Sequence, residues 1–497
     1  MIGDELIQQV KKNRYLESLD NVLYCDRWYN STKAAFAYHN ELSGFVSDLR
    51  QRSLVDPEVL ALLAKGEELP ETASDIEKGA LRFLKEKAHQ GQQIPADLAQ
   101  EVEKMNAIGQ QAWEQAYEAN DLTDYLPVMA QQFELRRKIA AAIDPTQHPY
   151  QVLVNLFDPE FSLEEIDSFF DQVKSLIVEL LKDCSPLTDS DRDQILKAPA
   201  SKAQMQAAGQ QVLALLQFSQ DNSTLYESRH PVCACVGPRD SRPSTNYQEL
   251  LRSIGALMHE AGHGMYNYNS SEEVVAAGLW GGLEGATHES QSIFYEKMVG
   301  TSFEFWQAFY PTLQKLVPHY QDISLTEFYQ AYTAINITPL RLSADELTYL
   351  LHIIIRYELE KGYYEGEYQI HELPTAWDQK YQEYLGVTPQ DLRQGILQDV
   401  HWGSGHIGYF QGYALGGAYA AQFKQKLLKD LPTAFEELAQ GDIGSINQWL
   451  AQQVHRHGQV YSSRQLLQKA TGEDFNGQYY IDYLRQKYQK TNGVFYP

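Results

Sequence analysis

Two histidines and a glutamate near the middle of the chain have a spacing that could bring their side chains to one metal ion. In the segment LMHEAGH, residues 257–263, His259 and His263 lie four residues apart. Residues four apart share one face of an α-helix, so both imidazoles can bind one Zn²⁺ ion. Glu260 follows the first histidine directly. We expect its carboxylate to act as general base on the metal-bound water and not to bind the metal itself.

A third ligand is expected because a catalytic zinc site uses three protein ligands and keeps one position open. Glu289 lies in the segment THESQ, residues 287–291, at the start of another predicted helix. Its carboxylate would complete a set of two histidines and one glutamate, and the neighbouring His288 is the alternative ligand. Gly262 and Gly264 interrupt the first helix at a cost of about 1 kcal/mol each relative to alanine. They indicate close approach of another backbone or of a substrate.

The elements around these residues are predicted to be mostly helices. Apolar residues from 250 to 258 place the histidine motif on a helix that packs against the core. A capping box, Ser162 with Glu165, opens an amphipathic segment that continues to residue 181. The stretch 221–248 contains three prolines and short β-favouring pieces, so we expect a small strand-and-loop insertion there. The chain is therefore predicted to be one mainly α domain over 1–497, with a helical lobe at 1–220 and a lobe at 221–497 that carries the metal motif.

The overall charge excludes some classes of partner. Among 497 residues, Lys plus Arg number 41 and Asp plus Glu number 66, which gives a formal net charge of -25. Such a surface repels nucleic acid and anionic membranes. No signal sequence and no apolar stretch of membrane-spanning length is evident. The four cysteines, Cys25, Cys184, Cys233 and Cys235, are expected to be free thiols, and the protein is expected in the cytoplasm.

Several segments together resemble the M32 family of carboxypeptidases. The pair HEAGH and HESQ is similar to the family's metal motifs, and LRLSAD at 340–345 is similar to its [I/N]-R-x-x-[A/S]-D motif. The segment GILQDVHW at 395–402 matches G-x-x-Q-D-x-H-W in full. Two motifs differ: the family's H-P-F is HPV at 230–232, and its D-x-R-x-T is DSRPS at 240–244.

The resemblance implies a large, mainly helical metallopeptidase with a deep central groove and a small β insertion near the active site. It also implies an enzyme, usually a homodimer, that removes single C-terminal residues from peptides with broad specificity. Zn²⁺ supports activity in the family, and Co²⁺ can substitute for it. The expected partners are therefore peptides with a free C-terminus.

A carboxypeptidase must recognise the free α-carboxylate of its substrate, and arginine does so through paired hydrogen bonds. Arg341 is the predicted receptor, with Arg242 and Arg356 as alternatives. The structural alternative for Arg341 is an ion pair with Asp345, four residues later.

The tetrahedral oxyanion needs a hydrogen-bond donor besides the metal. Imidazole and phenol groups can supply it, and the candidates are His401, Tyr409 and Tyr413. Asp399 or Asp345 is expected to orient a ligand histidine. Trp402 is expected to be a packing residue.

Two other functions use the same residues. An oligopeptidase that cuts internal bonds could carry the same zinc helix. A non-catalytic relative could hold peptide or metal without turnover, although intact His259, Glu260, His263 and Glu289 argue against it.

Overall fold

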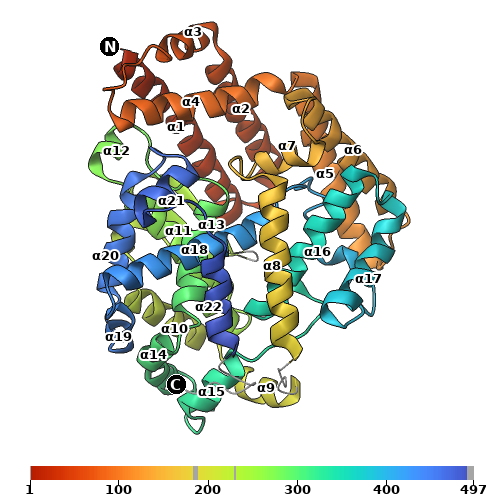
Figure 1. The fold of residues 1–497 in the computed structure, drawn as a ribbon, viewed down its shortest axis with the longest axis vertical. Coiled ribbons are helices and arrows are strands. Elements are labelled where there is room, and N and C mark those ends of the chain that lie inside the picture. Colours follow the sequence, from red (N-terminus) through yellow and green to blue (C-terminus); the bar gives the residue numbers. More distant parts are fainter. Residues whose placement is uncertain (1, 183–188, 229–230, 490–497) are drawn as a thin grey trace. The chain divides into compact units, whose positions relative to one another are not determined.

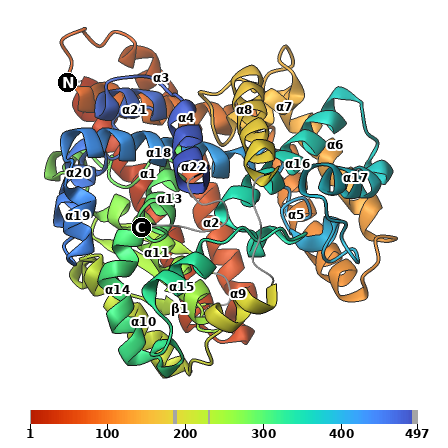
Figure 2. The same cartoon turned by 60° about the horizontal axis from the view of Figure 1, so that its bottom comes forward.

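The computed structural model describes residues 2–182, 189–228 and 231–489. Within these ranges the chain is predominantly α-helical, with one small sheet (Figures 1 and 2). The prediction of a mainly α fold with a small β insertion is confirmed. The expectations for Cys184 and for the HPV motif at His230 fall on residues outside the described ranges.

The chain divides into two compact units, each assembled from three stretches of sequence. Unit 1 contains residues 1–92, 193–329 and 416–476, and unit 2 contains residues 93–192, 330–415 and 477–497. The predicted lobes, 1–220 and 221–497, followed the order of the sequence, whereas these units interleave. The single-domain organisation stays a prediction.

Unit 1 carries the histidine motif. Its helices are α1 Ile2–Cys25, α2 Phe36–Val55, α3 Pro57–Gly66, α10 Lys202–Leu215, α11 Leu250–Tyr268, α12 Glu272–Ala276, α13 Ala286–Ile293, α14 Phe303–Leu316, α19 Ala434–Ala439, α20 Gly444–Gln453 and α21 Ser463–Thr471. Short π-helical turns, η1 Asp26–Asn30 and η4 Phe294–Val299, follow α1 and α13 directly.

Unit 2 carries the two later motifs. Its helices are α5 Ala96–Ala119, α6 Tyr125–Ile143, α7 Pro149–Asn155, α8 Leu163–Lys182, α16 Glu346–Glu365, α17 Leu373–Leu385 and α22 Gln478–Gln489. Four helices run across a division between the units: α4 Asp75–Gln93, α9 Asp189–Leu196, α15 Leu325–Tyr332 and α18 Gln411–Asp430.

The sheet lies where the sequence predicts a strand-and-loop insertion. It has three strands, β1 Tyr226–Glu227, β2 Cys233–Gly237 and β3 Asp240–Thr245, in the order β1-β3-β2. β2 and β3 are antiparallel, with an irregular register between Cys235 and Gly237, and β1 pairs with β3 in parallel. β2 and β3 pack against α11, and α1 also contacts β2. The insertion therefore supports the helix that carries the histidines.

Helix α11 is a central element of unit 1. It contacts α10, α13 and η4 as well as the sheet. Leu250, Ile254 and Leu257 on its apolar stripe are almost fully buried. Burying a leucine or isoleucine side chain stabilises a protein by about 1.5–3 kcal/mol, so this stripe fixes the helix firmly in the core.

Candidate active site

Helix α11 places its two histidines on the same face, as the four-residue spacing predicts. The ring centroids of His259 and His263 are 4.9 Å apart, and the rings are nearly perpendicular. Both side chains are largely enclosed, at 22% and 12% exposure. The Nε2 atoms of both rings lie near the carboxylate of Glu289, which is part of α13.

The carboxylate of Glu289 meets both imidazoles. Its Oε1 lies 3.7 Å from Nε2 of His259, and its Oε2 lies 3.8 Å from Nε2 of His263. Among the described residues, these three form the group of histidine, cysteine and acidic side chains that could hold a metal ion, with ligand atoms within 4.8 Å of one another. Two imidazole nitrogens and one carboxylate are the donor set of a catalytic zinc site. The residues therefore fit a divalent metal.

Two glycines allow the close approach that this geometry requires. A Cβ atom at Gly262 would lie 2.5 Å from the carbonyl oxygen of Gln291, so α11 and α13 pack backbone to backbone at this point. A Cβ atom at Gly416, in α18, would lie 2.9 Å from Cβ of Glu289. The close approach of another backbone that Gly262 indicates is thus present.

A second carboxylate, Glu296, holds one of the candidate ligands. Its Oε2 lies 2.9 Å from Nδ1 of His259, and its Oε1 lies 2.7 Å from Nζ of Lys297. The expectation that Asp399 or Asp345 orients a ligand histidine is wrong for His259. Glu296 lies seven residues after Glu289 on the continuous α13–η4 element, so both carboxylates face α11. That spacing is the signal in the sequence that could have identified Glu296.

Negative charge is concentrated around this point. Glu260 is buried, at 6% exposure. Burial raises the pKa of its carboxyl to about 7, with a smaller opposing effect of His259 and further raising by Glu289 and Glu296. For His259, burial lowers the pKa, but Glu289 and the bond to Glu296 outweigh it and raise the pKa to about 10. A divalent cation would neutralise this excess of carboxylates.

The alternative ligand, His288, lies beside the cluster and outside it. Its ring stacks on that of His263 with centroids 4.5 Å apart, and its Nε2 lies 3.4 Å from Oδ1 of Asn267. Burial lowers the pKa of His288 to about 4 and, together with His288, holds the pKa of His263 well below its ordinary value. A neutral imidazole at His263 suits metal binding.

In unit 2, Arg341 pairs with Asp399 and not with Asp345. Its Nη2 lies 2.6 Å and its Nε 3.1 Å from Oδ1 of Asp399, and its Nη1 donates to the hydroxyl of Tyr349 at 3.0 Å. Asp345 instead accepts the backbone N–H groups of Leu347 and Thr348 and so caps α16. The i,i+4 ion pair considered for Arg341 is therefore absent.

A chain of ring contacts joins His401, Tyr409 and Tyr413 and ends beside Arg341. The ring centroid of His401 is 5.8 Å from that of Tyr409, which is 5.4 Å from that of Tyr413. The guanidinium carbon of Arg341 lies 5.6 Å from the centre of the Tyr413 ring. Burial lowers the pKa of His401 to about 3, despite the opposing effect of Asp399, so its imidazole is neutral.

The two alternative arginines have other partners. Arg356 is fully buried and pairs with Asp399. Arg242, in β3 of unit 1, forms paired bonds to the carboxylate of Asp240 at 3.0 and 2.8 Å. Trp402 is a packing residue as expected: it is buried, and its indole N–H donates to Glu360 at 2.6 Å.

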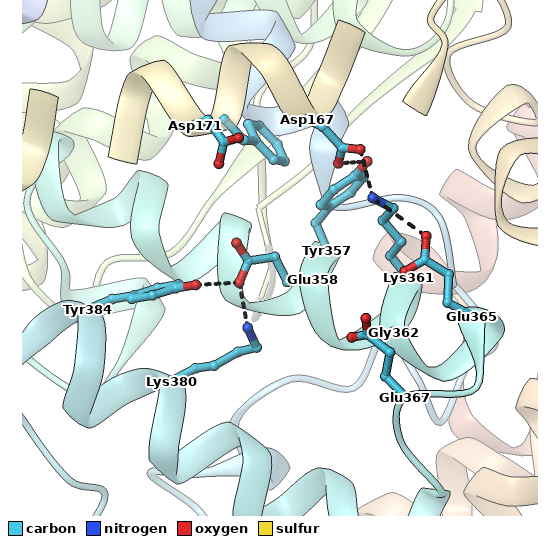
Figure 3. Close-up of a pocket in the computed structure, with 11 residues that line it drawn as sticks. Asp167, Asp171, Tyr357, Glu358, Lys361, Gly362, Glu365, Glu367, Lys380 and Tyr384 are labelled. Carbon is cyan, nitrogen blue, oxygen red and sulfur yellow. Dashed lines mark hydrogen bonds and ion pairs between the residues drawn. The ribbon is translucent and has the colours of Figure 1, made fainter. Parts of the chain in front are cut away.

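Unit 2 also contains a polar hollow of about 370 Å³ that includes none of these residues (Figure 3). Several of its charged groups pair with one another. Nζ of Lys380 and the hydroxyl of Tyr384 both donate to Glu358, and Lys361 donates to Asp167. We therefore interpret the hollow as a surface feature lined by a structural network of ion pairs.

None of the helices in the described ranges is long and apolar enough to cross a membrane. Cys25, Cys233 and Cys235 are free thiols, as expected.

Comparison with known proteins gives one consistent result. The model of the family described as carboxypeptidase Taq (M32) metallopeptidase matches residues 5–488. "Carboxypeptidase 1" of Bacillus subtilis is 36% identical over 418 residues, which cover 84% of this chain and 83% of that protein. "Thermostable carboxypeptidase 1" of Thermus thermophilus is 28% identical over 501 residues and 98% of both chains.

Solved structures agree in fold. A carboxypeptidase of Pyrococcus furiosus superposes with a TM-score of 0.93 at 27% identity, covering 98% of this chain and 99% of that one. The M32 carboxypeptidase of Deinococcus radiodurans superposes with a TM-score of 0.92 at 26% identity, covering 99% of both.

Proposed function

The chain belongs to the M32 family of metallocarboxypeptidases, and from this we propose that it is a zinc enzyme whose ligands are His259, His263 and Glu289. The observation that carries the proposal is the convergence of two Nε2 atoms on one carboxylate, at 3.7 and 3.8 Å. Co²⁺ would substitute, since it accepts the same nitrogen and oxygen donors. Peptides with a free C-terminus are the substrates.

When bound, Zn²⁺ would lower the pKa of a water molecule to near 7 and polarise the scissile carbonyl. Glu260 would accept the proton of the attacking water and return it to the leaving amine, which requires one carboxyl that can both lose and gain a proton. Its burial against other carboxylates, which raises its pKa, supports that role.

The residues of unit 2 would recognise the substrate. Arg341 would bind the terminal carboxylate, because Asp399 fixes its guanidinium from one side while the side chain keeps 7% exposure. His401, Tyr409 and Tyr413 would supply the donor to the oxyanion. Losing such a donor typically raises the barrier by about 2.7–4 kcal/mol. Arg242 is a weaker candidate for substrate contact, because its guanidinium already donates paired hydrogen bonds to Asp240.

A glutamine at position 260 tests the mechanism. We expect E260Q to retain its metal, measured by elemental analysis, while hydrolysis falls at least a thousandfold, on the order of 4 kcal/mol of barrier. The matched control is E284Q, a carboxylate of unit 1 that pairs with Lys87 outside the metal cluster. An E260Q variant with wild-type turnover would refute the assignment of the base.

A peptide ladder tests the reaction. We expect mass spectrometry to show loss of one C-terminal residue at a time, and this loss should stop when a chelator is added. Amidating the C-terminus should abolish cleavage. An oligopeptidase would instead cut the amidated peptide at an unchanged rate, and a non-catalytic binder would cut neither peptide.

The assembly and location of the protein are also part of the proposal. We expect a cytoplasmic homodimer, as the family resemblance and the free thiols suggest. Sedimentation analysis would test the dimer, which should run at twice the 56.7 kDa of one chain.

A further inference from the structure

Arg356 is a fully buried arginine near the proposed substrate residues. It has 0% exposure. Its Nε lies 2.7 Å from Oδ2 of Asp399, and its Nη1 donates to the backbone carbonyl of His352 at 2.6 Å and to the hydroxyl of Tyr381 at 3.0 Å. Its guanidinium carbon lies 4.4 Å from the centre of the Trp377 ring. Because no part of Arg356 reaches solvent, it does not contact a substrate directly.

Asp399 is shared between this arginine and Arg341. Oδ2 accepts chiefly from Arg356, at 2.7 Å from its Nε, and Oδ1 accepts from Arg341, at 2.6 Å from its Nη2. Charge-assisted bonds of this kind are about twice as strong as neutral ones, and two-pronged pairs also fix orientation. Asp399 therefore cannot turn without breaking bonds to both arginines.

The result is a defined orientation of the Arg341 fork. A guanidinium has five N–H donors. Nε and Nη2 of Arg341 each donate to Asp399, and Nη1 donates to Tyr349. One N–H on each terminal nitrogen remains without a partner among the residues that the structure describes. The terminal nitrogens therefore keep donor capacity for a substrate carboxylate, which a guanidinium binds through paired hydrogen bonds.

The charge of the cluster formed by Arg341, Arg356 and Asp399 favours binding of an anion. Two guanidinium groups face one carboxylate, and burial keeps the neighbouring His352 and His401 neutral by lowering the pKa of each. Glu360 also interacts electrostatically with Arg356, but burial raises its pKa and so favours its neutral form. Positive charge therefore predominates in the cluster, and a buried charge is costly unless it is paired. A substrate carboxylate would be that partner.

We propose that Arg356 is a positioning residue: acting through Asp399, it holds the guanidinium of Arg341 in the orientation that receives the α-carboxylate of the peptide. The proposal rests on the proposed role of Arg341. It assigns to Arg356 an indirect part in substrate affinity and no part in bond cleavage.

The test is the steady-state kinetics of R356K, which keeps the charge and removes the planar fork. We expect KM for a peptide with a free C-terminus to rise about tenfold, with kcat within twofold of wild type and the metal content unchanged. Y381F, which removes only the hydroxyl beside Arg356, covers the case in which R356K fails to fold. We expect its KM to rise about threefold. Unchanged KM in the folded variants would overturn the proposal, as would a loss confined to kcat.

A double-variant cycle separates positioning from a merely structural role. If Arg356 acts through Arg341, adding R356K to R341M should change KM by less than twofold, because the receptor is already absent. An equal tenfold increase in both backgrounds would show that Arg356 acts independently and would overturn the proposal. If R341M itself leaves KM unchanged, the proposed role of Arg341 fails, and with it the basis of the inference.

A matched control is R136K. Arg136 is also a buried arginine of unit 2, but it donates to the backbone oxygen of Gly405 at 2.7 Å and to Asn106, with no contact to Asp399. We expect R136K to lower thermal stability about as much as R356K does, while KM stays within twofold of wild type. A tenfold rise in KM for this variant would mean that any buried arginine of the unit has the same effect, which contradicts a specific role of Arg356.

Discussion

The carboxylate of Glu296 should control how tightly unit 1 binds its metal. It lies 2.9 Å from Nδ1 of His259, so it fixes both the orientation of that ring and the nitrogen that remains free to bind an ion. Burial opposes its ionisation, but Lys297 and His259 lower the pKa of Glu296 to about 2, so it is charged at neutral pH. Glutamine at this position keeps an acceptor and loses the charge, whereas alanine loses both.

The expected magnitudes follow from these differences. Removing the partner of a ligand histidine typically weakens metal binding about 10- to 100-fold. We expect E296Q to lie near the lower value and E296A near the upper one, which corresponds to about 1.4 and 2.7 kcal/mol of binding free energy. Competition for Zn²⁺ against a chromophoric chelator measures this affinity directly, without relying on catalysis.

The control is K297M. Lys297 bonds Oε1 of Glu296 at 2.7 Å, whereas His259 bonds Oε2, so we expect a change in zinc affinity of less than threefold. An E296A variant that binds Zn²⁺ as tightly as wild type would refute the reasoning. It would show that the packing of α11 alone orients His259.

Three further predictions concern packing, pH and metal removal. In G262A the added methyl would lie 2.5 Å from the carbonyl oxygen of Gln291, so we expect about 1–3 kcal/mol of destabilisation in a denaturant titration, while G255A on the same helix, where a methyl meets nothing within 4 Å, should show no loss. Burial raises the pKa of Glu360 to about 7, although the N–H of Gly408 lowers it. The buried side chain favours folding when it is protonated, so this stabilisation is complete below about pH 4.5 and is lost as the pH rises through 7. The decline, about 3 kcal/mol, should vanish in E360Q, and an identical pH profile for both proteins would contradict the assignment. Chelation should lower the thermal midpoint and added Zn²⁺ should restore it, because a ligand that binds only the folded state stabilises it; a midpoint indifferent to chelator would argue against a bound ion.

Local spacing in the sequence was sufficient to predict part of the fold and part of the candidate site. His259 and His263 share a face because helix geometry over four residues determines it, and the apolar stripe that buries α11 follows the same periodicity. The prolines and β-favouring residues of 221–248 likewise marked the sheet. The conflict between Gly262 and a helix interior indicated a close neighbour, and the neighbour is the backbone of α13.

Pairings across long stretches of chain were decided only by tertiary structure. Arg341 lies near Asp345 in sequence, yet its partner is Asp399, 58 residues away, because Asp345 is used to cap α16. Glu296 reaches His259 across 37 residues because α13 continues directly into η4. The interleaving of the two units, each assembled from three stretches of sequence, was likewise decided only by tertiary structure. Backbone geometry decides which side chains share a face within one element, but which elements meet depends on how all buried surfaces pack at once, and no short stretch of sequence contains that information.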